Sequence, residues 1–196
     1  DVILGYNNLQ DILKADEYFN FIIGRVCNRI SNSSFTLNQK KYDLFSNDND
    51  HHIHGGKNGF NSKIWKIKEI SKDKNSVKCT LSYFSKNLEE NYPGNLECTA
   101  TYELNNKNEF SIYYEATTDE DTIINLTNHN YWNFHGHSEH FQNIEDHYIK
   151  IISNFYCENN EESIPNGKIL NVKNSKFDLT NYFMIEKKFL NEGGID

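Results

Sequence analysis

Apolar and polar residues alternate along two neighbouring stretches in the middle of the chain. Within residues 96–104 every second position is apolar or aromatic and the positions between are Glu or Thr; the apolar set is Leu96, Cys98, Ala100, Tyr102 and Leu104. A similar alternation runs over residues 110–117, after an Asn-rich stretch at 105–108. A period of two is typical of strands with one buried face, and Asn suits the turn between them. The pattern predicts an antiparallel hairpin.

Other stretches extend the β prediction. Residues 64–70 and 77–85 read as a second hairpin around a polar connection, and further strands are expected at 123–126 and 147–155. Before the C-terminal tail, only residues 9–19 suggest a helix, and it is short. We therefore expect an all-β fold, a large antiparallel β-sandwich, built as a single domain over residues 1–196.

Composition narrows the class of partner. The chain has 196 residues, of which 37% are hydrophobic and 14% aromatic, enough for the core of one domain. A formal net charge of -8 argues against nucleic acid or an anionic membrane as partner. No apolar run approaches the ~20 residues of a membrane-spanning helix. The four cysteines form no C-x-x-C pair, and we expect free thiols in a cytoplasmic protein.

Histidines gather in two places, at 51–54 and at 129–140. Histidine both gives and takes a proton near neutral pH, and the two glycines after His54 allow a sharp turn beside a ligand. Two other interpretations stay open from the residues alone: solvated loop histidines, and a metal site made by alternate histidines on one strand face. Against the metal site, no H-E-x-x-H motif is present, and no carboxylate or cysteine stands at a familiar metal-ligand spacing. The residues alone predict a β protein with a histidine-lined polar site.

Several short motifs follow one another along the chain. In order they are Asp1-Val2-Ile3-Leu4-Gly5-Tyr6; Gly24-Arg25-Val26-Cys27-Asn28-Arg29-Ile30; His54-Gly55-Gly56 with Gly59-Phe60 and Trp65; Tyr92-Pro93-Gly94; Asn125-Leu126-Thr127-Asn128-His129-Asn130-Tyr131-Trp132-Asn133; and Ile164-Pro165-Asn166-Gly167 with Phe177-Asp178-Leu179. In this order the chain resembles the aldose 1-epimerase (galactose mutarotase) family, which interconverts the α and β anomers of free sugars. The resemblance implies the family's antiparallel supersandwich, truncated at both ends, because the family's first strands would precede Asp1 and its catalytic Glu and a sugar-binding Gln would follow Asp196.

The resemblance also assigns roles to residues. His129 matches the family's general acid, and His54 matches its second catalytic histidine, which binds the sugar near the ring oxygen and the C1 hydroxyl. The matching substrate-binding positions are Asn28, Arg29, Tyr131 and Asp196. We expect His54 and His129 to face one pocket whose wall includes Asn28 and Arg29. The resemblance implies no metal and no cofactor, and a small-molecule aldohexose as partner; it predicts no particular oligomeric state.

The chemistry of anomer exchange fixes what the site must supply. The hemiacetal ring opens, C1–C2 rotates and the ring closes on the other face, so a proton goes to the ring oxygen and another leaves the C1 hydroxyl. A histidine acid and a carboxylate base do this without metal or nucleotide. The chain's glutamates stand in none of the family's catalytic motifs, and Glu89, Glu90, Glu161 and Glu162 lie in polar stretches that we expect to be solvated. We therefore expect the chain to lack the base.

Two other functions remain open. A hexose-6-phosphate 1-epimerase would need a cluster of basic residues for the phosphate, preferably arginines. Arg25 and Arg29 are the only arginines, and we expect Arg29 to contact ligand and Arg25 to be structural. A non-catalytic carbohydrate-binding module would keep the pocket and lack the base.

Overall fold

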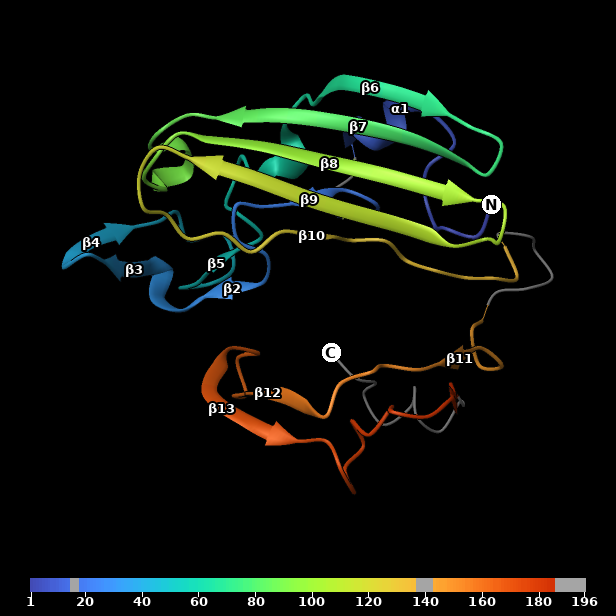
Figure 1. Cartoon of the computed structure of the whole chain (residues 1–196). Coiled ribbons are helices and arrows are strands. Elements are labelled where there is room, and N and C mark those ends of the chain that lie inside the picture. Colours follow the sequence, from blue (N-terminus) through green and yellow to red (C-terminus); the bar gives the residue numbers. More distant parts are fainter. Residues whose placement is uncertain (15–17, 137–142, 186–196) are drawn as a thin grey trace. The chain divides into compact units, whose positions relative to one another are not determined.

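A computed structural model describes residues 1–14, 18–136 and 143–185 of the chain (Figure 1). By its internal contacts the chain divides into two compact units. The first unit combines Asp1–Asn20 with His129–Asp196, and the second is Phe21–Asn128. Among the described residues, no helix has the length and apolar character that crossing a bilayer requires.

The second unit is built on a four-stranded antiparallel sheet with the order β6-β7-β8-β9. Its strands are β6 (Lys66–Lys72), β7 (Ser76–Ser85), β8 (Leu96–Asn105) and β9 (Phe110–Thr118). Both predicted hairpins are confirmed, because β6 pairs with β7 and β8 pairs with β9. The first hairpin begins at Lys66, two residues later than the expected residue 64. Trp65 belongs instead to the preceding loop, because its indole Nε1 donates to the carbonyl of Phe60 at 3.2 Å.

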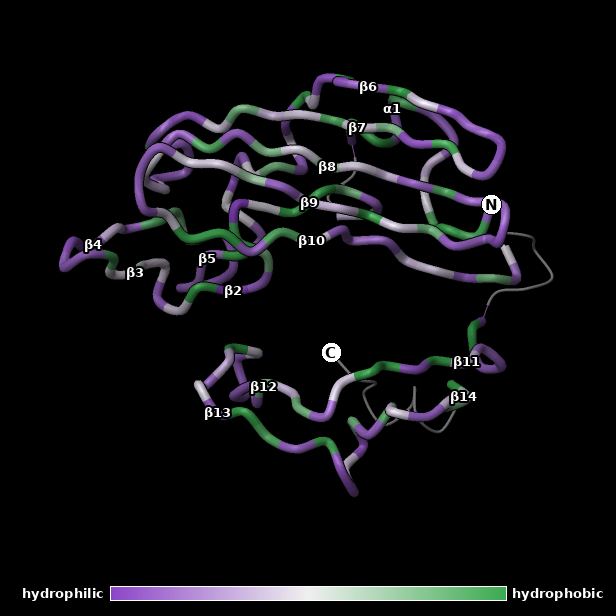
Figure 2. Tube along the Cα trace, in the orientation of Figure 1, coloured by the Kyte–Doolittle hydropathy of each residue, from purple (hydrophilic) through white to green (hydrophobic). Residues whose placement is uncertain are grey.

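Burial along β8 follows the alternation in its sequence, which Figure 2 traces by hydropathy. Leu96, Cys98 and Ala100 are at most 1% exposed and form a core cluster with Ile22 and Phe60. Ile22 comes from β1 (Ile22–Ile23), which pairs antiparallel with β10 (Thr127–Asn128). The core therefore lies between one face of the large sheet and the β1–β10 layer. On the opposite face, polar pairs such as Thr80 with Thr101 meet across strands.

Two small antiparallel pairs complete the second unit. The pair β2 (Arg29–Ile30) and β5 (His52–Ile53) carries the predicted sugar-binding segment, and β3 (Ser34–Leu37) pairs with β4 (Lys40–Asp43). Short 3₁₀ turns occur at η1 (Ser31–Ser33), η2 (Phe60–Ser62) and η3 (Glu89–Asn91). The turn η3 lies in the connection from β7 to β8.

The first unit contains one helix and two strand pairs in its described part. These are α1 (Leu9–Lys14), β11 (Tyr148–Ile149) with β14 (Phe183–Met184), and β12 (Phe155–Asn159) with β13 (Pro165–Asn171). Asn8 begins the helix, since its side-chain oxygen accepts the Asp11 N–H at 3.0 Å, as an N-cap does. The helix ends earlier than the expected 9–19: residues 18 and 19 are not helical, and 15–17 lie outside the described part.

Two strand predictions were wrong. Residues 123–126 form no strand, only an isolated bridge from Asn125 to Val26, because their partner is the irregular segment around Arg25 rather than a regular strand. Residues 147–155 do not form one strand either. Ile151 donates instead to the carbonyl of Leu179 at 2.7 Å, and a turn at Ser153 separates β11 from β12.

Candidate functional site

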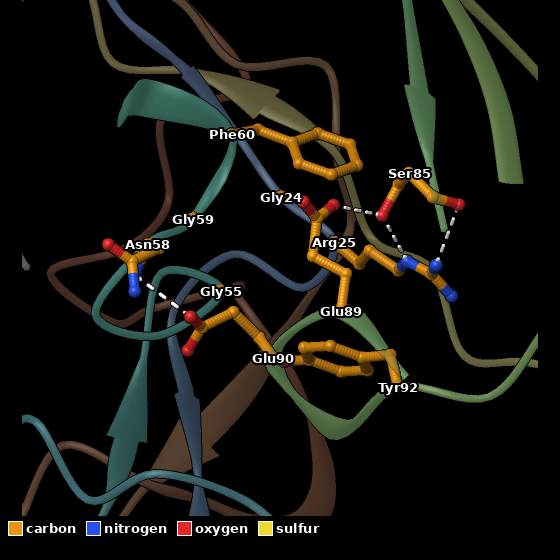
Figure 3. Close-up of a pocket in the computed structure, with 10 residues that line it drawn as sticks. All are labelled: Gly24, Arg25, Gly55, Asn58, Gly59, Phe60, Ser85, Glu89, Glu90 and Tyr92. Carbon is orange, nitrogen blue, oxygen red and sulfur yellow. Dashed lines mark hydrogen bonds between the residues drawn. The ribbon is translucent and has the colours of Figure 1, made fainter. Parts of the chain in front are cut away.

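Arg25 lies buried beneath the connection between β7 and β8 (Figure 3). Its guanidinium donates to the carbonyl oxygens of Ser85, Lys86, Pro93 and Gly94 at 2.7–3.1 Å, and its Nε donates to the Ser85 hydroxyl at 3.0 Å. Burial lowers the pKa of Arg25, but these acceptors match its planar fork of donors. The expectation that Arg25 is structural agrees with these contacts: it fixes both ends of the connection.

Glu89 sits in the same buried network, and the expectation that it is solvated was wrong. It accepts hydrogen bonds from the hydroxyls of Ser85 and Tyr83 and forms an ion pair with Lys63 at 2.8 Å. Burial works to raise the pKa of Glu89, but hydrogen bonds from Lys63, Ser85 and Tyr83 together hold it below its ordinary value. Glu89 is therefore an ionised structural carboxylate.

A narrow hollow opens between these groups and the loop after β5. Gly24, Gly59, Phe60, Glu89 and Tyr92 are among its lining residues (Figure 3). It leaves no room for a water-sized molecule, so no sugar enters it. This polar cluster is the scaffold beneath a site rather than the site itself.

Glu90 reaches from the connection to the loop that follows His54, so the expectation of a solvated Glu90 was wrong as well. Its two carboxylate oxygens accept the backbone N–H groups of Lys57 and Asn58, each at 3.1 Å. Figure 3 shows the contact with Asn58. A Cβ at Gly56 would lie 2.2 Å from the Glu90 carboxylate and 2.8 Å from the His52 ring, so a larger residue would displace Glu90 from its present position. Sequence reasoning missed this contact.

His54 stands at the end of β5 in a left-handed backbone conformation, with a φ of 54°. Its ring Nδ1 accepts the backbone N–H of Asn28 at 3.1 Å. A nitrogen that accepts a hydrogen bond carries no proton, so in the neutral ring Nε2 carries it. Residues 28 and 54 are thus held together, and the contact sets His54 as a donor through Nε2.

Arg29 adjoins this pair on β2. Its Nε donates to the carboxylate of Asp48 at 2.5 Å, and both side chains are about a quarter exposed. The amide oxygen of Asn28 accepts the N–H of Arg29 at 2.8 Å, which fixes the Asn28 side chain. Asp48 was not predicted, because an acidic residue in a polar loop has no distinguishing pattern.

His52 is structural. It is fully buried; its Nδ1 lies 2.9 Å from the carbonyl of Phe45 and its Nε2 lies 2.7 Å from the hydroxyl of Tyr92. A carbonyl only accepts, so Nδ1 carries the proton and Nε2 accepts from Tyr92. Burial lowers the pKa of His52 and keeps it neutral. Both nitrogens are occupied, and the alternative of a metal site on His52 and His54 is therefore wrong.

His129 lies in the first unit among aromatic rings. The ring centroids of Tyr18 and Tyr131 lie 6.0 Å and 5.1 Å from that of its imidazole, both roughly parallel to it. Phe19 meets Tyr131 edge-on at 4.7 Å, and the carbonyl of His129 accepts the N–H of Asn20 at 3.1 Å. The structure thus brings together His129 and Tyr131, two predicted site residues. Tyr18 was not predicted, because an aromatic residue at the end of a helical pattern reads as core.

A second histidine cluster in the first unit has the composition and the spacing of a metal site. The ligand atoms of His135, Asp146 and His147 lie within 4.8 Å of one another. However, Nε2 of His147 accepts the backbone N–H of Phe134 at 2.7 Å, so its Nδ1 carries the proton and faces the Asp146 carboxylate at 3.3 Å. A protonated nitrogen offers a metal no lone pair. Hydrogen bonds from His135 and His147 also hold the pKa of Asp146 below its ordinary value, so Asp146 is an ionised carboxylate hydrogen-bonded to both rings.

The predicted site residues therefore fall into two groups. His54, Asn28 and Arg29 belong to the second unit, whereas His129 and Tyr131 belong to the first. The expectation that both histidines face one pocket stays a prediction. Asp196 lies outside the described residues, as do His137 and His140.

Comparisons with known proteins identify the family. The family model described as aldose 1-epimerase matches residues 1–196. The galactose mutarotase of Sus scrofa is 37% identical over 179 residues, covering 91% of this chain and 50% of its own length. The aldose 1-epimerase of Haemophilus influenzae is 34% identical over 173 residues, covering 88% of this chain and 49% of its own.

A solved structure agrees with these sequence matches. The crystal structure of galactose 1-epimerase from Lactobacillus acidophilus superimposes with a TM-score of 0.83 at 27% identity, over 100% of this chain and 58% of that one. The expected all-β, mutarotase-like fold is thereby confirmed. The chain spans about half the length of the curated relatives it matches. It belongs to the aldose 1-epimerase family.

Proposed function

We propose that this protein is an aldose 1-epimerase, an isomerase that interconverts the α and β anomers of free aldohexoses such as galactose and glucose. The single observation that carries the proposal is the hydrogen bond from the Asn28 N–H to Nδ1 of His54. It sets the proton of His54 on Nε2 in a family whose relatives are named for mutarotation of a sugar.

In this proposal His129 is the general acid. It delivers a proton to the ring oxygen, the C1 hydroxyl loses a proton to a base, and the open aldehyde forms. After rotation about C1–C2 the two transfers reverse on the other face. Protons balance over the cycle and no electrons are exchanged, so the reaction needs neither metal nor cofactor.

His54 has a different task in this scheme. Its neutral ring donates through Nε2, which suits a sugar oxygen as acceptor. If the His54 ring gained a proton at Nδ1, it would lose the hydrogen bond from the backbone N–H of Asn28. We therefore assign His54 to sugar binding near C1 and the ring oxygen, and proton delivery to His129.

The remaining substrate-binding residues follow from the resemblance. Asn28 and Arg29 would contact sugar hydroxyls beside His54, and the side-chain amide oxygen of Asn28 accepts the backbone N–H of Arg29. Tyr131 is 42% exposed, which leaves ring surface for a ligand. Asp196 is the fourth proposed sugar contact.

A sugar phosphate is a poor substrate for this arrangement. Phosphate recognition favours arginines with unoccupied donors. Arg25 is committed to backbone carbonyls, and Arg29 stands beside the carboxylate of Asp48, which repels a phosphate but not a neutral hydroxyl. A free aldohexose, which brings hydroxyls and no charge, fits these residues better.

The base of the reaction is neither Glu89 nor Glu90 in this proposal, because both carboxylates are engaged in hydrogen bonds to the scaffold. We also place the protein in the cytoplasm, as a single aldose 1-epimerase domain that includes residues 1–196. The free state of Cys27, Cys79, Cys98 and Cys157 suits a reducing compartment.

Polarimetry of fresh α-galactose or α-glucose separates the enzyme from a carbohydrate-binding module. The 196-residue chain and a version extended at both ends are compared with the spontaneous rate. Acceleration by the extended version alone is expected. Equal acceleration by both would place a base within the 196 residues, and sugar binding without acceleration by either would favour the binding module.

A further inference from the structure

We propose that Glu90 is a positioning residue of the sugar site, fixing the loop that carries His54. The inference rests on the proposed function for its effect on sugar binding. Its structural part, the control of loop order by one carboxylate, stands on the contacts of Glu90 alone.

The loop from His54 to Phe60 is held from two sides. On one side lies Gly24: its carbonyl accepts the N–H of Phe60 at 3.1 Å, and a Cβ at Gly55 would meet the same oxygen at 1.7 Å. On the other side lies Glu90, whose carboxylate accepts two consecutive N–H groups, those of Lys57 and Asn58. The glycines after His54 therefore serve the close approach of the scaffold to the loop.

Glu90 is itself held in an uncommon conformation. Its φ is 48°, and its neighbours Leu88 and Asn91 have φ values of 65°. Left-handed conformations at three non-glycine residues persist only where the surroundings determine them. Arg25 anchors the two ends of this turn, because it binds the carbonyls of Lys86 and Pro93 on the two sides of η3. The bonds from Leu88 N–H to Tyr92 O and from Asn91 N–H to Leu88 O close the turn from within.

The contacts form a continuous path. Arg25 fixes the connection, and Glu90 from that connection fixes residues 57 and 58. The loop that contains these two residues begins at His54, whose ring accepts the N–H of Asn28. A carboxylate is suited to this place, since it presents two acceptors to two donors. The side-chain amide of glutamine has the same shape, but its NH₂ group would face one of the two backbone N–H donors and could not accept from it.

The test compares Glu90→Gln and Glu90→Ala with the unmodified full-length protein. Glu97→Gln is the matched control, because it makes the same change of charge on the exposed face of β8. Hydrogen exchange measured by mass spectrometry follows residues 54–59 and the strands β7 and β8. Mutarotation kinetics give KM and kcat separately.

We expect faster exchange at residues 54–59 in both Glu90 variants, with unchanged exchange in β7 and β8. We also expect KM to rise about 10-fold, as for loss of a hydrogen bond to a ligand, with a smaller change in kcat. Glu97→Gln should match the unmodified protein in both measurements. Because His54 is assigned to binding, a purely structural role of Glu90 would instead change stability and leave KM as it was.

Unchanged exchange at 54–59 in both Glu90 variants overturns the inference, as does an unchanged KM when exchange is faster. If the unmodified protein accelerates mutarotation of no aldose, the proposed function is wrong. The exchange measurement then decides by itself whether Glu90 fixes the loop.

Discussion

The backbone N–H of Asn28 donates a hydrogen bond to the ring Nδ1 of His54 at 3.1 Å. One contact thus joins β2 to the end of β5 and selects a tautomer. We expect ¹⁵N NMR at neutral pH to give an unprotonated Nδ1 and a protonated Nε2 for His54. The spectrum of His54→Gln identifies the signals, and a protonated Nδ1 in the neutral ring would contradict the assigned role.

His52 makes stability depend on pH. Burial lowers its pKa below the ordinary value of 6.5, so the unfolded chain binds a proton that the folded chain resists. The resulting loss of stability begins as pH falls through about 6.5 and grows towards the lower folded pKa. Urea unfolding at pH 7.5 and pH 5.5 measures it. His52→Gln should reduce the difference between the two pH values, and an unchanged difference would exclude His52 as its source.

Arg25 should be indispensable to the connection between β7 and β8. Arg25→Met leaves the carbonyls of Pro93 and Gly94 without their donor, and Arg25→Lys offers no fork to replace it. We expect either change to lower the free energy of unfolding by about 3–5 kcal/mol, the cost of removing one partner from a buried charged network. Lys86→Met, at an exposed side chain, is the control. A loss below about 1 kcal/mol would mean that the network is dispensable.

Alanine substitutions at two glycines distinguish the cost of steric crowding from the cost of backbone strain. Gly56 has a φ of 97° and Gly167 a φ of 87°, so alanine is strained at both. At Gly56 the added methyl would also meet Glu90 and His52, whereas nothing lies within 4 Å at Gly167. Gly167→Ala should cost about 1–3 kcal/mol in unfolding free energy, and Gly56→Ala should cost more. Equal losses of unfolding free energy for the two variants in chemical denaturation would contradict tight packing of Glu90 against this loop.

The sequence predicts what is local and periodic. The hairpin of β8 and β9 is readable because its alternation matches its one buried face. Residues 123–126 were misread because their pairing depends on an irregular segment about 100 positions earlier, Asn125 bridging Val26. A run of apolar residues does not reveal such a partner.

The same distinction holds for the candidate site. The histidines and glycines of the His54 loop stand out by residue type and spacing. Glu90 does not, because its role depends on a left-handed backbone and on a loop more than 30 residues earlier in the chain. The sequence around its neighbour Glu89 predicts a surface residue, because the three partners of Glu89, which are Lys63, Tyr83 and Ser85, are brought to it only by the fold.

The most direct test of the account is polarimetry of fresh α-galactose with the full-length protein and its His129→Ala variant, with His135→Ala as the histidine control. We expect acceleration over the spontaneous rate, a loss of roughly 10²–10⁴-fold in turnover for His129→Ala, the usual contribution of an acid–base group, and normal turnover for His135→Ala. Normal mutarotation by the His129→Ala variant would contradict the role of His129 as the general acid.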